Sequence, residues 1–197
     1  MELNNKSILF ICIKNKYCKE KGLIKAWKNY LKFIQGKYLG IKPKSFCHNG
    51  NPGCYHKPVW IWIYNDNNEF LIQKRASCKK RSPNKWDMPS AGHTNSNETR
   101  IEGTIRETKE ELGIEANKDE FKFLFEYIYD KNFEISEVYL LKCNMPIEEM
   151  TLAKEEVAEV KWVKYDELEK IIFSKEFTSL TKEYKDKILE TLKALIK

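Results

Sequence analysis

Three glutamates are the feature of this 197-residue chain that points most directly to chemistry. Glu107, Glu110 and Glu111 would share one side of a helix, and Glu107 and Glu111 are like charges one turn apart, which destabilises an isolated helix. Mg²⁺ favours carboxylate oxygens and would relieve the repulsion. Arg106 lies one turn before Glu110, where it pairs with Glu110 or orients a neighbouring carboxylate. The spacing indicates a magnesium site, with a solvated helix face as the competing interpretation.

The helix that carries these glutamates is marked at both ends. Residues 92–114 read GHTNSNETRIEGTIRETKEELGI. The polar turn at 95–97 supplies capping residues and Gly113 supplies a stop, so we predict a helix over about residues 99–112. By helical periodicity, the face opposite the glutamates carries Ile101, Ile105, Thr108 and Leu112.

Hydrophobic patterns around this helix predict the strands of a sheet. Two runs, VWIWIYN at 59–65 and EFLIQKR at 69–75, are typical of a hairpin with its turn at 66–68. Three further strands and one helix are expected, at 121–128, 135–142 and 157–163 and then at 166–172. An amphipathic terminal helix is defined by Leu180, Tyr184, Ile188, Leu192 and Leu195.

The first fifty residues differ from the rest of the chain. Residues 7–13 favour a strand, residues 23–34 carry apolar side chains at helical spacing, and the proline-containing stretch 42–58 favours a loop or boundary. We therefore expect an N-terminal extension at 1–50, a main domain at 51–173 and a C-terminal helix at 174–197 packed on that domain.

Composition limits the partners. The formal charge of +6 is spread over lysines without a dense basic run, which makes nucleic acid an unlikely partner and leaves small anionic ligands. The six cysteines form no CxxC pair, which indicates reduced thiols rather than a zinc ribbon or a disulfide framework. No apolar run is long enough to span a membrane. We expect a cytoplasmic protein with no membrane partner.

Residues 92–114 resemble the Nudix box, which reads Gly, five residues, Glu, seven residues, Arg-Glu, aliphatic, any, Glu-Glu, any, Gly, aliphatic. The positions that match in register are Gly92, Glu98, Arg106, Glu107, Glu110, Glu111, Gly113 and Ile114. Thr108 departs, because the pattern has an aliphatic residue there, and this puts packing in doubt more than catalysis. The resemblance implies the Nudix fold of the α+β class, a mixed β-sheet sandwiched between helices, here with a partly helical N-terminal extension.

The resemblance also implies roles for these residues. The metal ligands would be Glu107, Glu110, Glu111 and the Gly92 carbonyl, and the metal would be Mg²⁺, with Mn²⁺ as a substitute. Glu98 and Arg106 would support catalysis, the arginine by orienting a glutamate. A general base must deprotonate the attacking water, and the candidates are Glu111 and, on a later strand, Glu137.

A more specific resemblance covers residues 54–172, where YHKPVWIWIYN, LIQKRASCKK and WDMPSAGH are similar to isopentenyl diphosphate isomerases and related hydrolases. It implies that Arg75 and Lys79 hold the substrate diphosphate, a task that suits guanidinium and ammonium groups. His56 and His93 match two metal histidines of the isomerases, although both are also credible as structural residues.

Two departures favour hydrolysis over isomerisation. Ala91 stands where the isomerases need a cysteine, and Ile135 stands where they have an acidic metal ligand, whereas every glutamate of the hydrolases is present. We predict a Mg²⁺-dependent pyrophosphohydrolase that cleaves a diphosphate linkage in a nucleoside diphosphate derivative or similar small metabolite. The alternatives are an isopentenyl diphosphate isomerase and a non-catalytic protein that binds a nucleotide or RNA. A homodimer is left open.

Overall fold

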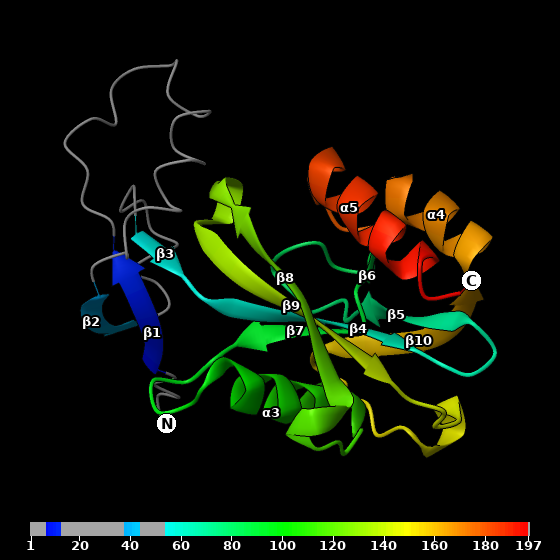
Figure 1. The fold of residues 1–197 in the computed structure, drawn as a ribbon, viewed down its shortest axis with the longest axis horizontal. Coiled ribbons are helices and arrows are strands. Elements are labelled where there is room, and N and C mark those ends of the chain that lie inside the picture. Colours follow the sequence, from blue (N-terminus) through cyan, green and yellow to red (C-terminus); the bar gives the residue numbers. More distant parts are fainter. Residues whose placement is uncertain (1–6, 13–37, 44–53, 197) are drawn as a thin grey trace.

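The described part of the chain is a mixed sheet with helices on both faces. The computed structural model describes residues 7–12, 38–43 and 54–196, with side chains from Tyr55 onward. Helix α3 (Arg100–Leu112) lies on one face, and α4 (Tyr165–Phe173) and α5 (Lys182–Lys193) lie together on the other (Figure 1). The predicted sheet between helices is confirmed.

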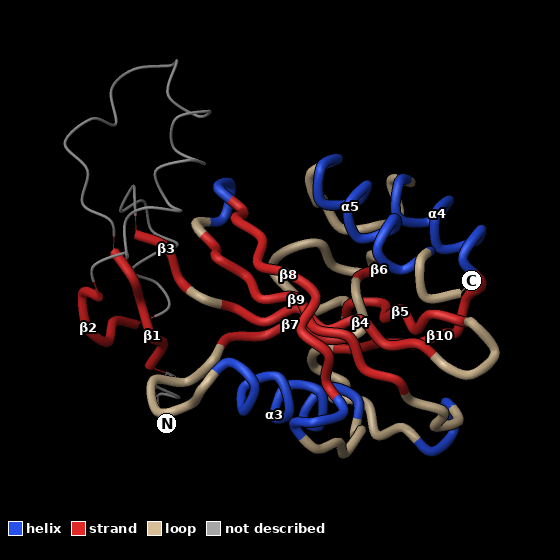
Figure 2. Tube along the Cα trace, viewed as in Figure 1, coloured by secondary structure: helices blue, strands red, loops and turns tan. Residues whose placement is uncertain are grey.

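The sheet of the described residues has ten strands. Their order is β10-β5-β4-β9-β3-β1-β2, with β6 paired to β5, β7 to β4 and β8 to β9. Figure 2 shows the sheet running between α3 and the pair of helices α4 and α5, with β1, β2 and β3 at its left-hand end. The bounds are β1 (Ser7–Cys12), β2 (Tyr38–Pro43), β3 (Cys54–His56), β4 (Pro58–Tyr64), β5 (Glu69–Arg75), β6 (Trp86–Asp87), β7 (Ser90–His93), β8 (Phe121–Tyr129), β9 (Glu134–Lys142) and β10 (Val157–Lys164). Short 3₁₀ turns form η1 (Lys118–Glu120), η2 (Asp130–Asn132) and η3 (Ile147–Glu149).

Strand β4 is central, and its pairing departs from a simple hairpin. The two expected strands and their turn are present, yet β4 and β5 pair only next to the turn, at Tyr64 and Phe70. Beyond that point β4 runs between β7, antiparallel, and β9, parallel. Its apolar run is continuous because both faces of a central strand are buried.

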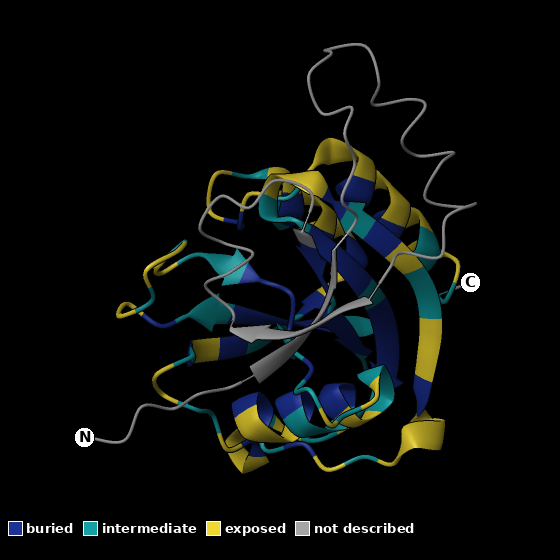
Figure 3. Cartoon of the chain, turned by 90° about the vertical axis from the view of Figure 1, so that its left-hand side faces the viewer, coloured by how far each residue is buried: buried dark blue, intermediate teal, exposed yellow. Residues whose placement is uncertain are grey.

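Two apolar cores lie on the two faces of the sheet. Alternation along β4 sends Trp60 and Trp62 toward α4 and α5, and Val59, Ile61 and Ile63 toward α3. Figure 3 shows the buried residues gathered between the sheet and the helices. Trp60 and Trp62 are thus core residues.

The C-terminal helix belongs to one of these cores. Helix α5 buries Tyr184 completely, and the Tyr184 hydroxyl accepts a hydrogen bond of 2.9 Å from Nε1 of Trp62 on β4. The predicted amphipathic helix is thus confirmed, although it begins at Lys182 and ends at Lys193. No helix of the described residues is long and apolar enough to cross a membrane.

The N-terminal predictions are only partly covered. The strand expected at 7–13 is present as β1, while the helix expected at 23–34 lies outside the described residues. Within the stretch expected to be a loop, 42–58, β2 ends at Pro43, Cys54–His56 form β3, and β4 starts at Pro58. Residues 54–56 are extended because β3 pairs with β1 and β9, a distant contact that local turn signals do not report.

Candidate active site

Helix α3, which carries the glutamates, begins and ends at strong local signals. Thr99 is its N-cap, in a capping box in which Glu102 accepts a 2.7 Å hydrogen bond from the Thr99 amide. The cap expected at 95–97 is therefore wrong in position, because Asn95 is engaged by the Glu98 carboxylate at 2.8 and 2.9 Å. Gly113 ends the helix with φ at 70°, the left-handed cap that the sequence predicts.

The buried face of α3 includes two of the three glutamates. Glu107 is 9% exposed and Glu111 6% exposed, so the prediction that both lie opposite the buried face is wrong. The helix packs on the sheet through residues spaced three and four apart, namely Thr104, Glu107, Thr108, Glu111 and Leu112. Only Glu110 faces solvent, with its side chain 49% exposed.

Two small residues let this polar face pack. A Cβ atom on Gly92 in β7 would lie 1.9 Å from Cδ of Glu107, so the absence of a side chain there makes room for that carboxylate. Thr108 is fully buried and donates a 2.8 Å hydrogen bond from Oγ1 to the Thr104 carbonyl. The hydroxyl at the position that departs from the aliphatic pattern is therefore satisfied.

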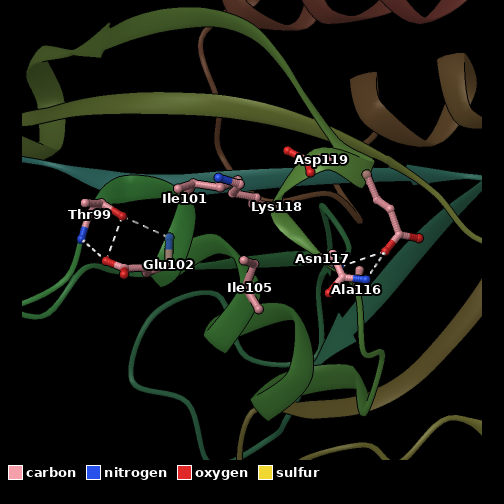
Figure 4. Close-up of a pocket in the computed structure, with 9 residues that line it drawn as sticks. Thr99, Ile101, Glu102, Ile105, Ala116, Asn117, Lys118 and Asp119 are labelled. Atoms are coloured by element: carbon pink, nitrogen blue, oxygen red, sulfur yellow. Dashed lines mark hydrogen bonds between the residues drawn. The ribbon is translucent and has the colours of Figure 1, made fainter.

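The opposite side of α3 borders a pocket that is separate from the glutamates. Figure 4 shows Ile101 and Ile105 of α3 facing residues 116–120, next to the capping contacts of Thr99 and Glu102. These two isoleucines are half-buried, which explains why the apolar periodicity of the helix does not identify the face that packs on the sheet.

Arg106 ties the glutamates and the loop before them into one network. Its guanidinium donates to Glu98 at 2.7 and 3.0 Å, to Glu107 at 2.8 Å, to Glu110 at 3.0 Å and to the His93 carbonyl at 2.8 Å. Burial acts to lower the pKa of Arg106, but the bonds to Glu98 and the charge of Glu107 outweigh it and raise that pKa. Burial acts to raise the pKa of Glu98, yet Arg106 and Asn95 lower it to about 2.

Glu111 points away from Arg106 and toward the sheet. One carboxylate oxygen accepts from the Ala91 amide at 3.3 Å and lies 3.5 Å from Nε2 of Gln73, a buried residue of β5. Burial first, and then the charge of Glu107, raise the pKa of Glu111 to about 8. Gln73 is a contact that the sequence analysis missed. Its only signal in the sequence is that this polar residue directly follows the apolar run 70–72 of the same strand.

The geometry bears on a metal in two ways. Among the described residues no three His, Cys, Asp or Glu side chains are close enough together to hold an ion, since Arg106 draws Glu107 and Glu110 to one side while Glu111 bonds to Ala91. The donor chemistry nevertheless fits Mg²⁺, because Glu107 and Glu111 are two buried carboxylates one helical turn apart, a like-charged pair that a hard cation stabilises.

Glu137 lies elsewhere on the same face of the sheet. Val59 on β4 is the register partner of Gly92 on β7 at one side and of Glu137 on β9 at the other. The Glu137 carboxylate lies 3.4 Å from Nε of Arg100 and accepts a 2.5 Å hydrogen bond from the Tyr139 hydroxyl. Arg100 begins α3, about 10 Å along the helix axis before Glu107. The structure does not bring Glu137 together with Glu111.

Arg75 and Lys79 are each related to Glu111 through one other residue. Arg75 follows Gln73 by two residues on β5, so the two side chains share a face. Lys79 forms an ion pair with Glu156, whose charge contributes to the raised pKa of Glu111. Arg75 is thus one strand repeat from a residue that contacts Glu111, and Lys79 pairs with a carboxylate that acts on Glu111 electrostatically.

The two histidines form a separate cluster. The rings of His56 and His93 stack with centroids 4.8 Å apart. His56 Nε2 lies 3.7 Å from Glu134, because β3 pairs with β9 at these two residues. Ungapped matching puts the acidic metal ligand of the isomerases at Ile135. The structure places the carboxylate of Glu134, one residue earlier, beside His56.

Comparison with known proteins agrees with this architecture. The NUDIX domain model matches residues 55–183. Nudix hydrolase 3 of Arabidopsis thaliana is 35% identical over 144 residues, which cover 67% of this chain but only 18% of the plant protein. An isopentenyl-diphosphate delta-isomerase of Aliivibrio fischeri is 32% identical over 145 residues, covering 69% of this chain and 79% of the isomerase. A solved structure from Deinococcus radiodurans aligns with a TM-score of 0.55 at 19% identity, over 70% of this chain and 81% of the other.

The fold is a mixed β-sheet between helices, with a glutamate-bearing helix packed on one face. The chain belongs to the Nudix family, whose hydrolases act on phosphoric anhydrides and typically use divalent metal cations. The resemblance to the isomerase-related branch is likewise confirmed.

Proposed function

We propose that this protein is a Mg²⁺-dependent Nudix pyrophosphohydrolase that cleaves a diphosphate linkage in a nucleoside diphosphate derivative or similar small metabolite. The observation that supports it most is the buried pair Glu107 and Glu111, with Gly92 directly against the Glu107 carboxylate. Gln73, which contacts Glu111, precedes Arg75 by two residues on β5, so acidic groups for a cation and a basic group for a phosphate lie on one face of the sheet. That combination suits a metal-assisted attack on a diphosphate.

The proposed metal ligands are Glu107, Glu110, Glu111 and the carbonyl of Gly92. Bound there, Mg²⁺ (or Mn²⁺) would neutralise phosphate oxygens and lower the pKa of an attacking water. Arg106 fixes Glu107 and Glu110, and Glu98 fixes Arg106 through two hydrogen bonds. For Glu110 to reach the ion, its bond to Arg106 would have to break, while the two bonds from Glu98 would keep the arginine beside Glu107.

The general base is proposed to be Glu111 rather than Glu137. Glu111 is buried within the glutamate cluster of α3, where its carboxylate could accept a proton from a water beside the ion. Glu137 is engaged by Arg100 and Tyr139 at the other end of α3. Arg75 and Lys79 are proposed to bind the substrate phosphates.

A panel of nucleoside diphosphate derivatives, assayed with Mg²⁺ and with Mn²⁺ for the nucleoside monophosphate and the second phosphomonoester that hydrolysis of the linkage releases, tests this function. The Glu110→Gln, Glu111→Gln double variant is expected to lose at least about a hundredfold in kcat. Glu115→Gln is the matched control, because Glu115 is exposed and pairs only with Lys109 among the described contacts. Turnover that survives in the double variant would refute the assignment, and saturable binding without turnover would favour the non-catalytic alternative.

Isomerisation of isopentenyl diphosphate is the second candidate, favoured by the cluster of His56, His93 and Glu134. Ala91 opposes it, since no thiol is available to protonate an alkene carbon. Incubation with isopentenyl diphosphate and Mg²⁺, followed by NMR, decides the matter: interconversion of the two five-carbon diphosphates would replace our proposal.

The setting of the protein is also part of the proposal. We propose a cytoplasmic location, where Cys78 and Cys143 stay free thiols as they are in the structure. The proposed partner is a small-molecule diphosphate, with a homodimer left open. The division into an extension at 1–50, a Nudix domain at 51–173 and a C-terminal helix at 174–197 remains a prediction.

A further inference from the structure

Asp87, the second residue of β6, is a buried carboxylate with both oxygens bonded. It is 8% exposed. Oδ2 accepts from Nη1 of Arg75 at 3.1 Å, and Oδ1 accepts from the Met88 amide at 2.9 Å and from Oγ1 of Thr178 at 2.8 Å. A buried charge with complete partners is fixed in place, because any movement exposes an unpaired polar atom to an apolar interior.

The carboxylate and Arg75 depend on each other. Burial raises the pKa of Asp87, and the charge of Arg75 is the largest influence that opposes it. Arg75 is held at a second point, where its Nε donates to the Arg81 carbonyl at 3.2 Å. The contacts found among the described residues engage Nε and one terminal nitrogen, so the other terminal nitrogen can bond to a ligand.

This arrangement lies beside the glutamates. Gln73 and Asp87 are register partners on β5 and β6, and Gln73 contacts Glu111. Arg75 follows Gln73 by two residues, about 7 Å along the strand. Asp87 therefore holds the guanidinium of Arg75. Arg75 is one strand repeat from Gln73, which contacts Glu111.

The hydroxyl that fixes Asp87 comes from the connection between α4 and α5. The Thr178 amide donates to the Trp86 carbonyl at 2.8 Å, and the Trp86 amide donates to the Glu176 carbonyl at 2.8 Å. This segment thus runs along β6, and it brings Thr178 to a carboxylate 91 residues earlier in the chain.

We propose that Asp87 is a positioning residue for substrate binding, which fixes the Arg75 guanidinium for a phosphate of the substrate and is itself fixed by Thr178. The inference rests on the proposed function, in which Arg75 binds phosphate. A purely structural Asp87 would affect the stability of the fold and leave the affinity for a diphosphate unchanged.

Calorimetric binding of methylenediphosphonate in Mg²⁺ to the full chain tests the inference, because this diphosphate analogue cannot be hydrolysed. Asp87→Asn keeps an acceptor for Met88 and Thr178 but removes the charge that holds Arg75. We expect it to weaken binding about tenfold, the usual effect of losing an orienting partner. Arg75→Ala should weaken binding at least as much, and the double variant should bind like Arg75→Ala alone.

Two further variants keep the outcome clear. Thr178→Val, which removes the hydroxyl with little change in shape, should weaken binding in the same direction by a smaller factor. Asp66→Asn is the control, because Asp66 is an exposed carboxylate that pairs with Lys142, and its affinity should equal that of the wild type. If Asp87→Asn is poorly folded, the affinities of Thr178→Val and Arg75→Ala for methylenediphosphonate still test the inference.

The inference is overturned if Asp87→Asn and Thr178→Val bind like the wild type, or if Asp87→Asn weakens binding by its full factor in the Arg75→Ala background. Failure of the proposed function looks different. A wild type that binds methylenediphosphonate but hydrolyses no compound of the panel loses the proposed hydrolysis and keeps this inference. A wild type that hydrolyses the panel but binds the analogue equally in all variants loses only the inference.

Discussion

At the scale of single residues, the ion pair between Glu98 and Arg106 decides how the glutamates are held. Arg106 bonds to three carboxylates, and Glu98 fixes it by two of those bonds. The pKa of Glu98 is lowered to about 2, so its folded form favours the charged state. Its contribution to stability is fully present above its ordinary pKa near 4.5 and is lost as the pH falls toward 2.

Glu98→Gln is therefore expected to lower the free energy of unfolding by about 1 kcal/mol at pH 7. The difference from the wild type should shrink as the pH falls from about 5 toward 2, because the wild-type carboxylate then becomes neutral as well. Urea unfolding of the wild type and of Glu98→Gln at several pH values measures this difference in the free energy of unfolding. A difference that is constant over this range would show that the Glu98 charge contributes nothing.

Gly92→Ala tests the close contact between β7 and α3. The added Cβ would lie 1.9 Å from Cδ of Glu107, so that carboxylate must move. We expect kcat to fall at least about a hundredfold, with about 1–3 kcal/mol lost in stability from the overpacked contact. Thermal melts and steady-state kinetics with Mg²⁺ provide the two measurements.

Gly113→Ala is the contrasting variant for this experiment. Gly113 has φ at 70°, and a Cβ there would lie 2.8 Å from the Thr151 amide nitrogen, so it too should lose stability. Its position at the end of α3 is away from Gly92, and we expect its activity to fall much less. Equal losses of activity in the two variants would mean that displacement of Glu107 is not the cause.

At the scale of elements, local signals predict much of the molecule. The bounds expected for α3 are correct within one residue and its stop is Gly113, although its cap is Thr99 and not the turn at 95–97. Alternating or apolar runs place β5, β8, β9 and β10. The packed face of α3 is harder to predict, because Ile101 and Ile105 are only half-buried whereas Glu107 and Glu111 are covered by the sheet. The periodicity of apolar residues predicts which side chains prefer to be buried. It does not predict that two charged side chains, Glu107 and Glu111, lie on the buried face.

The contacts that complete the site are distant in sequence. Parallel pairing of β4 with β9, the pairing of His56 with Glu134 and the bond from Thr178 to Asp87 join segments with no shared local pattern. The box motif supplies Glu98 through Glu111, while Gln73 and Asp87 stand outside it. Only the folded sheet brings these residues together.

At the scale of the whole molecule, α5 is joined to the central strand by a buried hydrogen bond from Trp62 to Tyr184. Tyr184→Phe leaves the indole nitrogen of Trp62 without this acceptor, and we expect a loss of about 1–3 kcal/mol in the free energy of unfolding. Activity per folded molecule should not change, because both residues lie in the core on the opposite face of the sheet from α3. An unchanged unfolding midpoint would show that this bond does not stabilise the docked helix.

The account as a whole depends on where a divalent ion binds. Anomalous diffraction from a crystal of the full chain soaked in Mn²⁺ measures this directly. We predict a peak among Glu107, Glu110, Glu111 and the Gly92 carbonyl, with Arg106 displaced from Glu110. A peak beside His56, His93 and Glu134, with none at the glutamates of α3, would contradict it.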